Sequence, residues 1–143
     1  MTAPVAKLES IVSQGHVRTG EEAGRFTVDG VRPEAAVFPG SVEEVSEVLA
    51  ACAEARVGVI PWGGGTSMGL GAIPSRGEVA LALTRLDRVL EHVPGDMTST
   101  VQCGMALGAY QAALGAHGQF LPLDAPRPEL ATLQAKQGFL RLL

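Results

Sequence analysis

The segment that decides the fold reads Val57-Gly58-Val59-Ile60-Pro61-Trp62-Gly63-Gly64-Gly65-Thr66-Ser67-Met68-Gly69-Leu70-Gly71. A short apolar run ends in consecutive glycines, two hydroxyl residues and further glycines, which predicts a buried strand followed by a loop almost without side chains. Glycine lets the backbone adopt positive φ and lets a ligand approach its N–H groups closely. Successive N–H groups of this kind form a concave anion site. The loop is therefore predicted to bind a phosphate group.

Two common nucleotide-binding motifs do not match this loop. A Walker loop carries lysine before its hydroxyl residue, whereas Gly65 precedes Thr66 here. A dinucleotide fingerprint has the spacing G-x-G-x-x-G and opens a helix, but Gly63, Gly65 and Gly69 miss that spacing by one residue. Residues 72–77 are more typical of a turn than of a helix start. A bound phosphate would thus be held mainly by backbone dipoles.

Four further segments accompany the loop in a characteristic order. They are residues 33–45 (PEAAVFPGSVEEV), 83–90 (LTRLDRVL), 101–104 (VQCG) and 118–124 (GQFLPLD). Together with the loop they resemble the FAD-linked oxidases of the vanillyl-alcohol-oxidase/PCMH type, and within that family the subunits of glycolate- or lactate-oxidase type. The resemblance implies an α/β (α+β), PCMH-type FAD-binding fold. The chain would supply its first subdomain, with a βαβ unit, and part of its second.

The resemblance also implies a cofactor and its contacts. FAD is the expected cofactor, and the residues expected to contact it are Trp62, Gly63, Gly64, Gly65, Thr66, Ser67, Met68, Gly69 and Pro122. Some family members attach the flavin to a histidine, whose position falls on Gly65, so FAD should be bound non-covalently. The implied reaction is oxidation of a 2-hydroxy acid such as glycolate or lactate, with hydride passing to the flavin. No catalytic base is assigned.

The family pattern divides the chain into three parts. Residues 1–24 are interpreted as an N-terminal extension, 25–133 as a partial FAD-binding domain and 134–143 as a divergent tail. The family pattern A-T-[IL]-G-G matches from Ala131 to Leu133 but then loses its glycine pair. The chain is therefore expected to be a truncated N-terminal part that is inactive alone, or else a subunit completed by a partner chain.

Hydrophobic periodicity predicts the local structure. Strands are expected at residues 35–38, 57–61, 78–83, 88–93 and 98–103, and helices at 4–14, from Ser41 onward and from Leu107 to Gly115, with 15–34 a loop that contains one short strand. Ser41 and Glu44 match a capping box at a helix start. The strand–helix–strand order predicts a right-handed βαβ unit with parallel strands. The glycine loop then follows its second strand, where open α/β sheets bind ligands.

The composition narrows the possible classes of protein. The chain has 143 residues, 46% of them hydrophobic, which suits one domain with a core. Its net charge of −4 argues against a nucleic-acid partner. We find no apolar run long enough for a membrane span and no secretory signal. Cys52 and Cys103 are interpreted as reduced core thiols, which favours the cytoplasm. The three histidines, His16, His92 and His117, lack metal-ligand spacing, so no metal is expected.

Other interpretations of the loop stay open at this point. Residues 65–69 match the G-x-S-x-G string of a serine-hydrolase nucleophile elbow, with Ser67 as nucleophile. An elbow requires a helix after the serine and a later histidine, whereas no helix is predicted here and only His92 and His117 follow. The chain could equally be a non-catalytic flavin- or nucleotide-binding fragment. A flexible turn without a ligand is the remaining interpretation.

Overall fold

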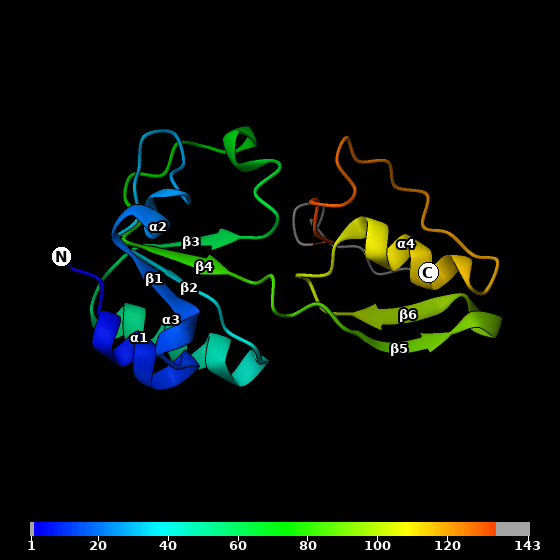
Figure 1. The fold of residues 1–143 in the computed structure, drawn as a ribbon, viewed down its shortest axis with the longest axis horizontal. Coiled ribbons are helices and arrows are strands. Elements are labelled where there is room, and N and C mark those ends of the chain that lie inside the picture. Colours follow the sequence, from blue (N-terminus) through cyan, green and yellow to red (C-terminus); the bar gives the residue numbers. More distant parts are fainter. Residues whose placement is uncertain (1, 134–143) are drawn as a thin grey trace. The chain divides into compact units, whose positions relative to one another are not determined.

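The computed structural model describes residues 2–133, which form two compact units. The first unit contains the residues up to Trp62 together with Ser67–Arg85. The second contains Gly63–Thr66 together with the residues from Leu86 onward (Figure 1). The chain therefore passes from the first unit to the second at Gly63 and returns to the first unit at Ser67. It passes to the second unit again after Arg85.

A four-stranded sheet forms the centre of the first unit. Its strands are β1 (Val17–Thr19), β2 (Ala35–Val37), β3 (Val59–Trp62) and β4 (Val79–Ala82), in the order β1-β2-β4-β3. β1 is antiparallel to β2, whereas β4 is parallel to both β2 and β3. The expected parallel arrangement of β2 and β3 is confirmed. They are not neighbours, however, because β4 lies between them.

Two helices pack against this sheet, α1 (Val5–Val12) and α3 (Val42–Glu54), and both lie on the same side of it in Figure 1. The predicted cap of α3 by Ser41 is confirmed, since Glu44 N–H donates to Ser41 Oγ at 3.2 Å. The returning bond differs from that of a capping box, because the Glu44 carboxylate accepts from Gly40 N–H, at 2.7 Å, and not from Ser41 N–H. Both helices contribute to the apolar core, which includes Leu8, Val12, Val37, Val48 and Val79. Burial of these side chains holds the sheet and helices together.

The region before β2 is more ordered than the sequence indicated. Residues 15–34 were expected to be a loop with one short strand; the strand is β1, but a 3₁₀ turn, η1 (Gln14–His16), and a short helix, α2 (Gly20–Gly24), flank it. α2 begins and ends at glycine, so it carries no periodic signal. Residues 1–24 were interpreted as an extension; among them, Leu8, Val12 and Val17 lie in the core of the first unit.

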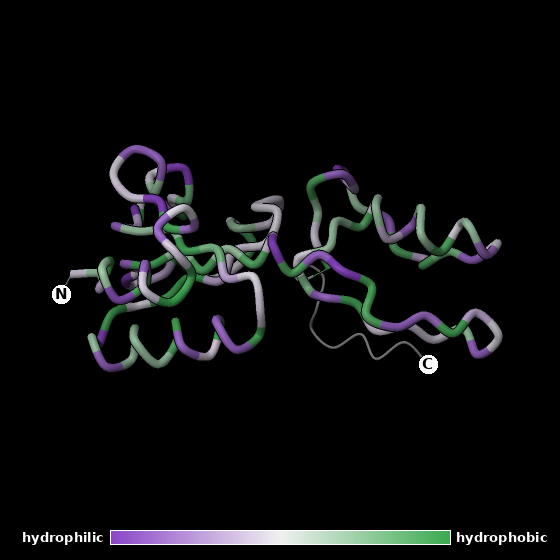
Figure 2. The backbone as a smooth tube through the Cα atoms, turned by 60° about the horizontal axis from the view of Figure 1, so that its bottom comes forward, coloured by the Kyte–Doolittle hydropathy of each residue, from purple (hydrophilic) through white to green (hydrophobic). Residues whose placement is uncertain are grey.

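The second unit consists of a hairpin and a helix. β5 (Val89–Val93) and β6 (Thr98–Val101) pair antiparallel through the 3₁₀ turn η3 (Pro94–Asp96), and α4 (Leu107–Gly115) follows. The predicted strands and helix are all present. Hydrophobic and hydrophilic stretches alternate along the hairpin (Figure 2), but Leu90 and Val93 are exposed, so the apolar residues of β5 do not all lie on one covered face. The unit has its own core, formed by Leu107, Tyr110, Leu114, Leu121, Ala125, Ala131 and Leu133.

Two expectations about the whole chain can be compared with the described residues. Both cysteines are free thiols, but only Cys52 lies in a core; Cys103 is half-buried, so its prediction as a core thiol is wrong. None of the helices within residues 2–133 has the length and apolar character needed to cross a bilayer. The predicted divergent tail, 134–143, lies outside the described residues.

Candidate cofactor-binding site

The glycine loop begins where β3 ends, as the sequence predicts. Trp62 closes the strand, and its carbonyl accepts a hydrogen bond from Leu83 N–H at 2.9 Å. Its ring packs edge-on against Phe26, with 5.0 Å between centroids, and Phe26 packs in the same way against Phe38. The half-buried indole of Trp62 is thus held by aromatic packing within the first unit.

Consecutive backbone N–H groups of the loop have no acceptor within residues 2–133. Gly65 has φ +70°, a left-handed conformation that favours glycine. Among the described residues, no acceptor is hydrogen-bonded to the N–H groups of Gly65, Thr66 and Ser67. These residues are half-buried, so unpaired donors here are costly unless water or a ligand satisfies them. The arrangement suits a phosphate group.

A single turn of 3₁₀ helix, η2 (Met68–Leu70), follows the loop, with Leu70 N–H donating to the Ser67 carbonyl at 3.2 Å. Gly69 is exposed, and a β-carbon there would meet no atom within 4 Å. The turn is too short to act as the α-helix of a dinucleotide fingerprint or of a nucleophile elbow. Its role is to turn the chain away from the loop.

Gly64 contacts a distant segment of the same unit, whereas a β-carbon on Gly69 would meet no atom within 4 Å. Its N–H donates to Thr132 Oγ1 at 3.2 Å, across 68 residues of sequence. A β-carbon on Gly64 would overlap the carbonyl oxygen of Leu130. The predicted contact between Gly64 and the cofactor stays a prediction, and the structure shows that Gly64 is needed for this close approach of the chain to itself.

Sequence reasoning missed the partners of Gly64. It noted residues 131–133 as part of a family pattern but gave Thr132 no contact. The residues next to Thr132 in the sequence do not indicate its hydrogen bond, because its partner Gly64 lies 68 residues away. The one available signal is a polar residue between apolar Ala131 and Leu133, since a polar side chain at a buried position requires a hydrogen-bond partner.

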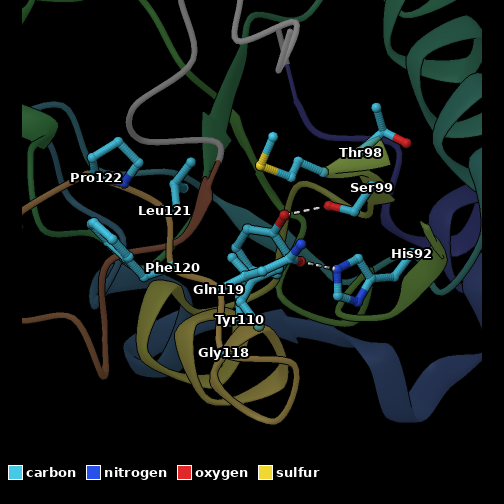
Figure 3. Close-up of a pocket in the computed structure, with 11 residues that line it drawn as sticks. His92, Thr98, Ser99, Tyr110, Gly118, Gln119, Phe120, Leu121 and Pro122 are labelled. Carbon is cyan, nitrogen blue, oxygen red and sulfur yellow. Dashed lines mark hydrogen bonds between the residues drawn. The ribbon is translucent and has the colours of Figure 1, made fainter. Parts of the chain in front are cut away.

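Pro122 lines a cavity of about 350 Å³ in the second unit. Two hydrogen bonds cross this cavity (Figure 3): one joins Ser99 to Tyr110, and the other joins His92 Nε2 to Gln119 Oε1 at 2.9 Å. No residue of the loop from Trp62 to Gly69 is among those that line it. The cavity therefore does not bring Pro122 together with the other predicted contacts.

The loop carries no ionisable side chain that could act as an acid or base. Residues 62–69 contain only Trp, Gly, Thr, Ser and Met. Within residues 2–133 there is also no group of histidine, cysteine and carboxylate residues able to hold a metal ion. Burial raises the pKa of both the Cys52 and the Cys103 thiol, which makes them poor nucleophiles. The loop can bind and orient a ligand, but its side chains offer no proton transfer.

Comparison with known proteins identifies the family of this site. A family model described as FAD binding domain matches residues 33–135. The chain belongs to this family. FAD is accordingly the cofactor of the domain, as predicted. The serine-hydrolase interpretation finds no support, since His92 is bonded to Gln119 and only a 3₁₀ turn follows Ser67.

Curated relatives share this part of the sequence. A D-2-hydroxyglutarate dehydrogenase of Xanthomonas citri pv. viticola is 41% identical over 92 residues, which are 64% of this chain and 20% of the relative. The glycolate oxidase subunit GlcD of Bacillus subtilis is 31% identical over 101 residues, or 71% of this chain and 22% of the relative. The chain thus spans about a fifth of the length of these relatives.

Solved structures share the fold. An alkyldihydroxyacetonephosphate synthase matches 90% of this chain with a TM-score of 0.77 and 26% identity, over 27% of its own length. p-Cresol methylhydroxylase with bound substrate matches 88% of this chain with a TM-score of 0.73 and 21% identity, over 26% of its own length. The expected PCMH-type fold is confirmed, and the chain contains a part of it.

Proposed function

We propose that this chain binds the diphosphate of FAD through the backbone N–H groups of Gly65, Thr66 and Ser67, within an oxidoreductase that acts on a 2-hydroxy acid. The observation that carries the proposal is the row of three donors without an acceptor among the described residues, in a chain of the FAD-binding domain family. The relatives named for D-2-hydroxyglutarate and glycolate support the substrate class.

Each part of the loop would contribute differently to binding. The three N–H groups would hold phosphate oxygens by dipolar hydrogen bonds, and the Thr66 and Ser67 hydroxyls would add neutral donors. FAD, when bound, supplies the two-electron oxidation. Gly65 has no nucleophilic atom with which to tether a flavin, so attachment through this loop would be non-covalent.

The substrate side of the site is a separate part of the proposal. The chain spans about a fifth of the length of its relatives, and its loop has no acid or base. We infer that residues outside this sequence, in the same chain or in a partner subunit, complete the substrate site, and that the 143 residues alone do not turn over a hydroxy acid. The free thiols Cys52 and Cys103 support a reducing compartment such as the cytoplasm.

Calorimetric titration with ADP, ADP-ribose and adenosine tests the phosphate-binding part of the proposal. ADP should bind at least tenfold more tightly than adenosine, a difference of about 1.4 kcal/mol, because the loop recognises the diphosphate. Equal affinity for ADP and adenosine would show that the loop is not a phosphate site. Absence of ADP binding by the folded protein would refute the proposal altogether.

A matched pair of variants assigns the binding to the loop. Gly69 has open space around its Cβ position, so Gly69→Asn and Gly69→Asp should both fold normally. The aspartate adds a negative charge two residues after Ser67, the last of the three proposed donors, and should weaken ADP binding about tenfold relative to the asparagine. Equal ADP affinities of the two variants would place the diphosphate elsewhere.

A further inference from the structure

We propose that Thr132 is a positioning residue of the glycine loop: by holding Gly64 N–H, it fixes the loop so that the following three N–H groups stay available to phosphate. This inference rests on the proposed function. Thr132 does not itself need to touch the cofactor. Its effect on binding would come through the backbone of the loop.

The first observation is the burial and pairing of Thr132. Its accessible surface is only 4% of the maximum, and it is the one polar residue classed as buried among residues 2–133. A buried hydroxyl is costly unless it is hydrogen-bonded. Its Oγ1 accepts the hydrogen bond from Gly64 N–H at 3.2 Å. The hydroxyl is therefore placed where a loop donor satisfies it.

The second observation is that the backbone around Thr132 is itself fixed. Leu107 N–H, in the first turn of α4, donates to the Ala131 carbonyl at 2.8 Å, and Leu133 N–H donates to the Met105 carbonyl at 3.0 Å. Thr132 also forms an isolated antiparallel bridge with Ala106. These contacts on both sides hold the Thr132 backbone in place relative to the start of α4.

The third observation is the close approach of the two segments. The Leu130 carbonyl oxygen fills the space where any side chain at position 64 would begin. Gly64 therefore lies against residues 130–132 with its N–H directed to Thr132, and this N–H is occupied. Gly65 then adopts its left-handed conformation, and the N–H groups of Gly65, Thr66 and Ser67 have no acceptor among the described residues. The contact with Thr132 thus fixes the loop directly before these three donors.

Three variants of the full 143-residue chain test this role. Thr132→Val keeps the shape of the side chain but removes the hydroxyl, and Thr132→Ser keeps the hydroxyl but removes a methyl group. Leu114→Ala removes a buried side chain from the same core and serves as the control for lost stability. ADP affinity, thermal midpoint and the hydrogen-exchange rate of Gly64 N–H are measured for each.

We expect Thr132→Val to weaken ADP binding about fivefold and to accelerate exchange at Gly64 N–H, because one hydrogen bond is lost. Thr132→Ser should restore both values to within about twofold of the wild type. Leu114→Ala should lower the thermal midpoint while the folded protein keeps its ADP affinity. This pattern would separate positioning of the loop from general stability.

Two results would overturn the inference while leaving the proposed function intact. One is wild-type ADP affinity in Thr132→Val. The other is an equal loss of affinity in Thr132→Val and Leu114→Ala, which would reduce Thr132 to a contributor to stability. If the folded wild-type protein fails to bind ADP at all, the proposed function fails first, and the positioning role fails with it.

Discussion

The carbonyl oxygen of Leu130 occupies the position at which Gly64 would carry a β-carbon. The glycine at this position is therefore required by the chain's own packing, whether or not a ligand is bound. A substitution at Gly64 intended to block a ligand would disturb the fold as well. Gly69, in the open turn η2, is the better position for testing ligand contacts.

Gly64→Ala should destabilise the protein by about 1–3 kcal/mol, because the new methyl group forces the Leu130 backbone to move. Gly69→Ala, in the same loop region but with open space around its Cβ position, should change the free energy of unfolding by less than about 0.5 kcal/mol. Denaturant unfolding of both variants checks the prediction. Equal stabilities would mean that residues 130–132 do not pack on the loop.

A second prediction concerns Glu78, which connects the beginnings of β3 and β4. Its carboxylate accepts Gly58 N–H at 2.5 Å, and Arg76 Nε lies 3.8 Å away. Burial raises the pKa of Glu78, but the backbone N–H groups of Gly58 and Glu78 and the charge of Arg76 outweigh it, so the pKa lies below its usual value of 4.5. The ionised form is therefore favoured by folding.

A lowered pKa contributes stability that is present above the unfolded-state value and is lost as the pH falls through the folded-state value. Glu78→Gln keeps an acceptor oxygen but cannot ionise. It should be less stable than the wild type at neutral pH by about 1 kcal/mol, and this difference should vanish in acid. Urea unfolding between about pH 7 and pH 3 measures it. A difference that is independent of pH would contradict the assignment.

A third prediction concerns Tyr110 and Ser99 in the second unit. Tyr110 is buried, and its hydroxyl is hydrogen-bonded to Ser99 Oγ, which joins α4 to β6. Tyr110→Phe should cost about 1 kcal/mol of unfolding free energy because it removes one buried hydrogen bond. In a double-mutant cycle with Ser99→Ala, the second substitution should add little. Full additivity of the two losses would show that the hydroxyls do not interact.

A fourth prediction concerns attachment of the flavin. Because Gly65 and the other residues of the loop from Trp62 to Gly69 include no histidine or cysteine that could tether a flavin, acid precipitation of FAD-loaded protein should release all flavin into the supernatant. Denaturing electrophoresis under ultraviolet light provides the measurement. Fluorescence that stays with the protein band would require a covalent bond to another residue.

The sequence predicts most of the local elements because their signals are local. Examples are the Ser41 cap, the apolar face of α3 and the glycine loop after β3. Each of these signals is formed by residues that lie close together in the sequence. The position of β4 between β2 and β3 does not follow from such signals, since both pairings are long-range and parallel. The short helix α2, bounded by glycines, also gives no periodic pattern.

The same distinction between local and long-range signals applies to the candidate site. Glycines and hydroxyls predict an anion-binding loop from the residue types alone, whereas the Gly64–Thr132 hydrogen bond joins positions 68 residues apart. Side chains at such separations meet only through the packing of the second unit. The motif around Pro122 is recognisable in the sequence. In the structure, however, Pro122 lines the cavity beside Tyr110, and no residue of the glycine loop lines that cavity.

The strand order β1-β2-β4-β3 has a consequence for how the protein is made. Both parallel neighbours, β2 and β3, hydrogen-bond to β4, which is the last of the four strands to be synthesised. Until residues 79–82 leave the ribosome, β3 has no ladder partner in this sheet, and the glycine loop follows an unpaired strand. Because parallel, non-local pairings form slowly, the nascent chain passes through a stage in which its glycine loop has been synthesised but has no paired strand to hold it in place.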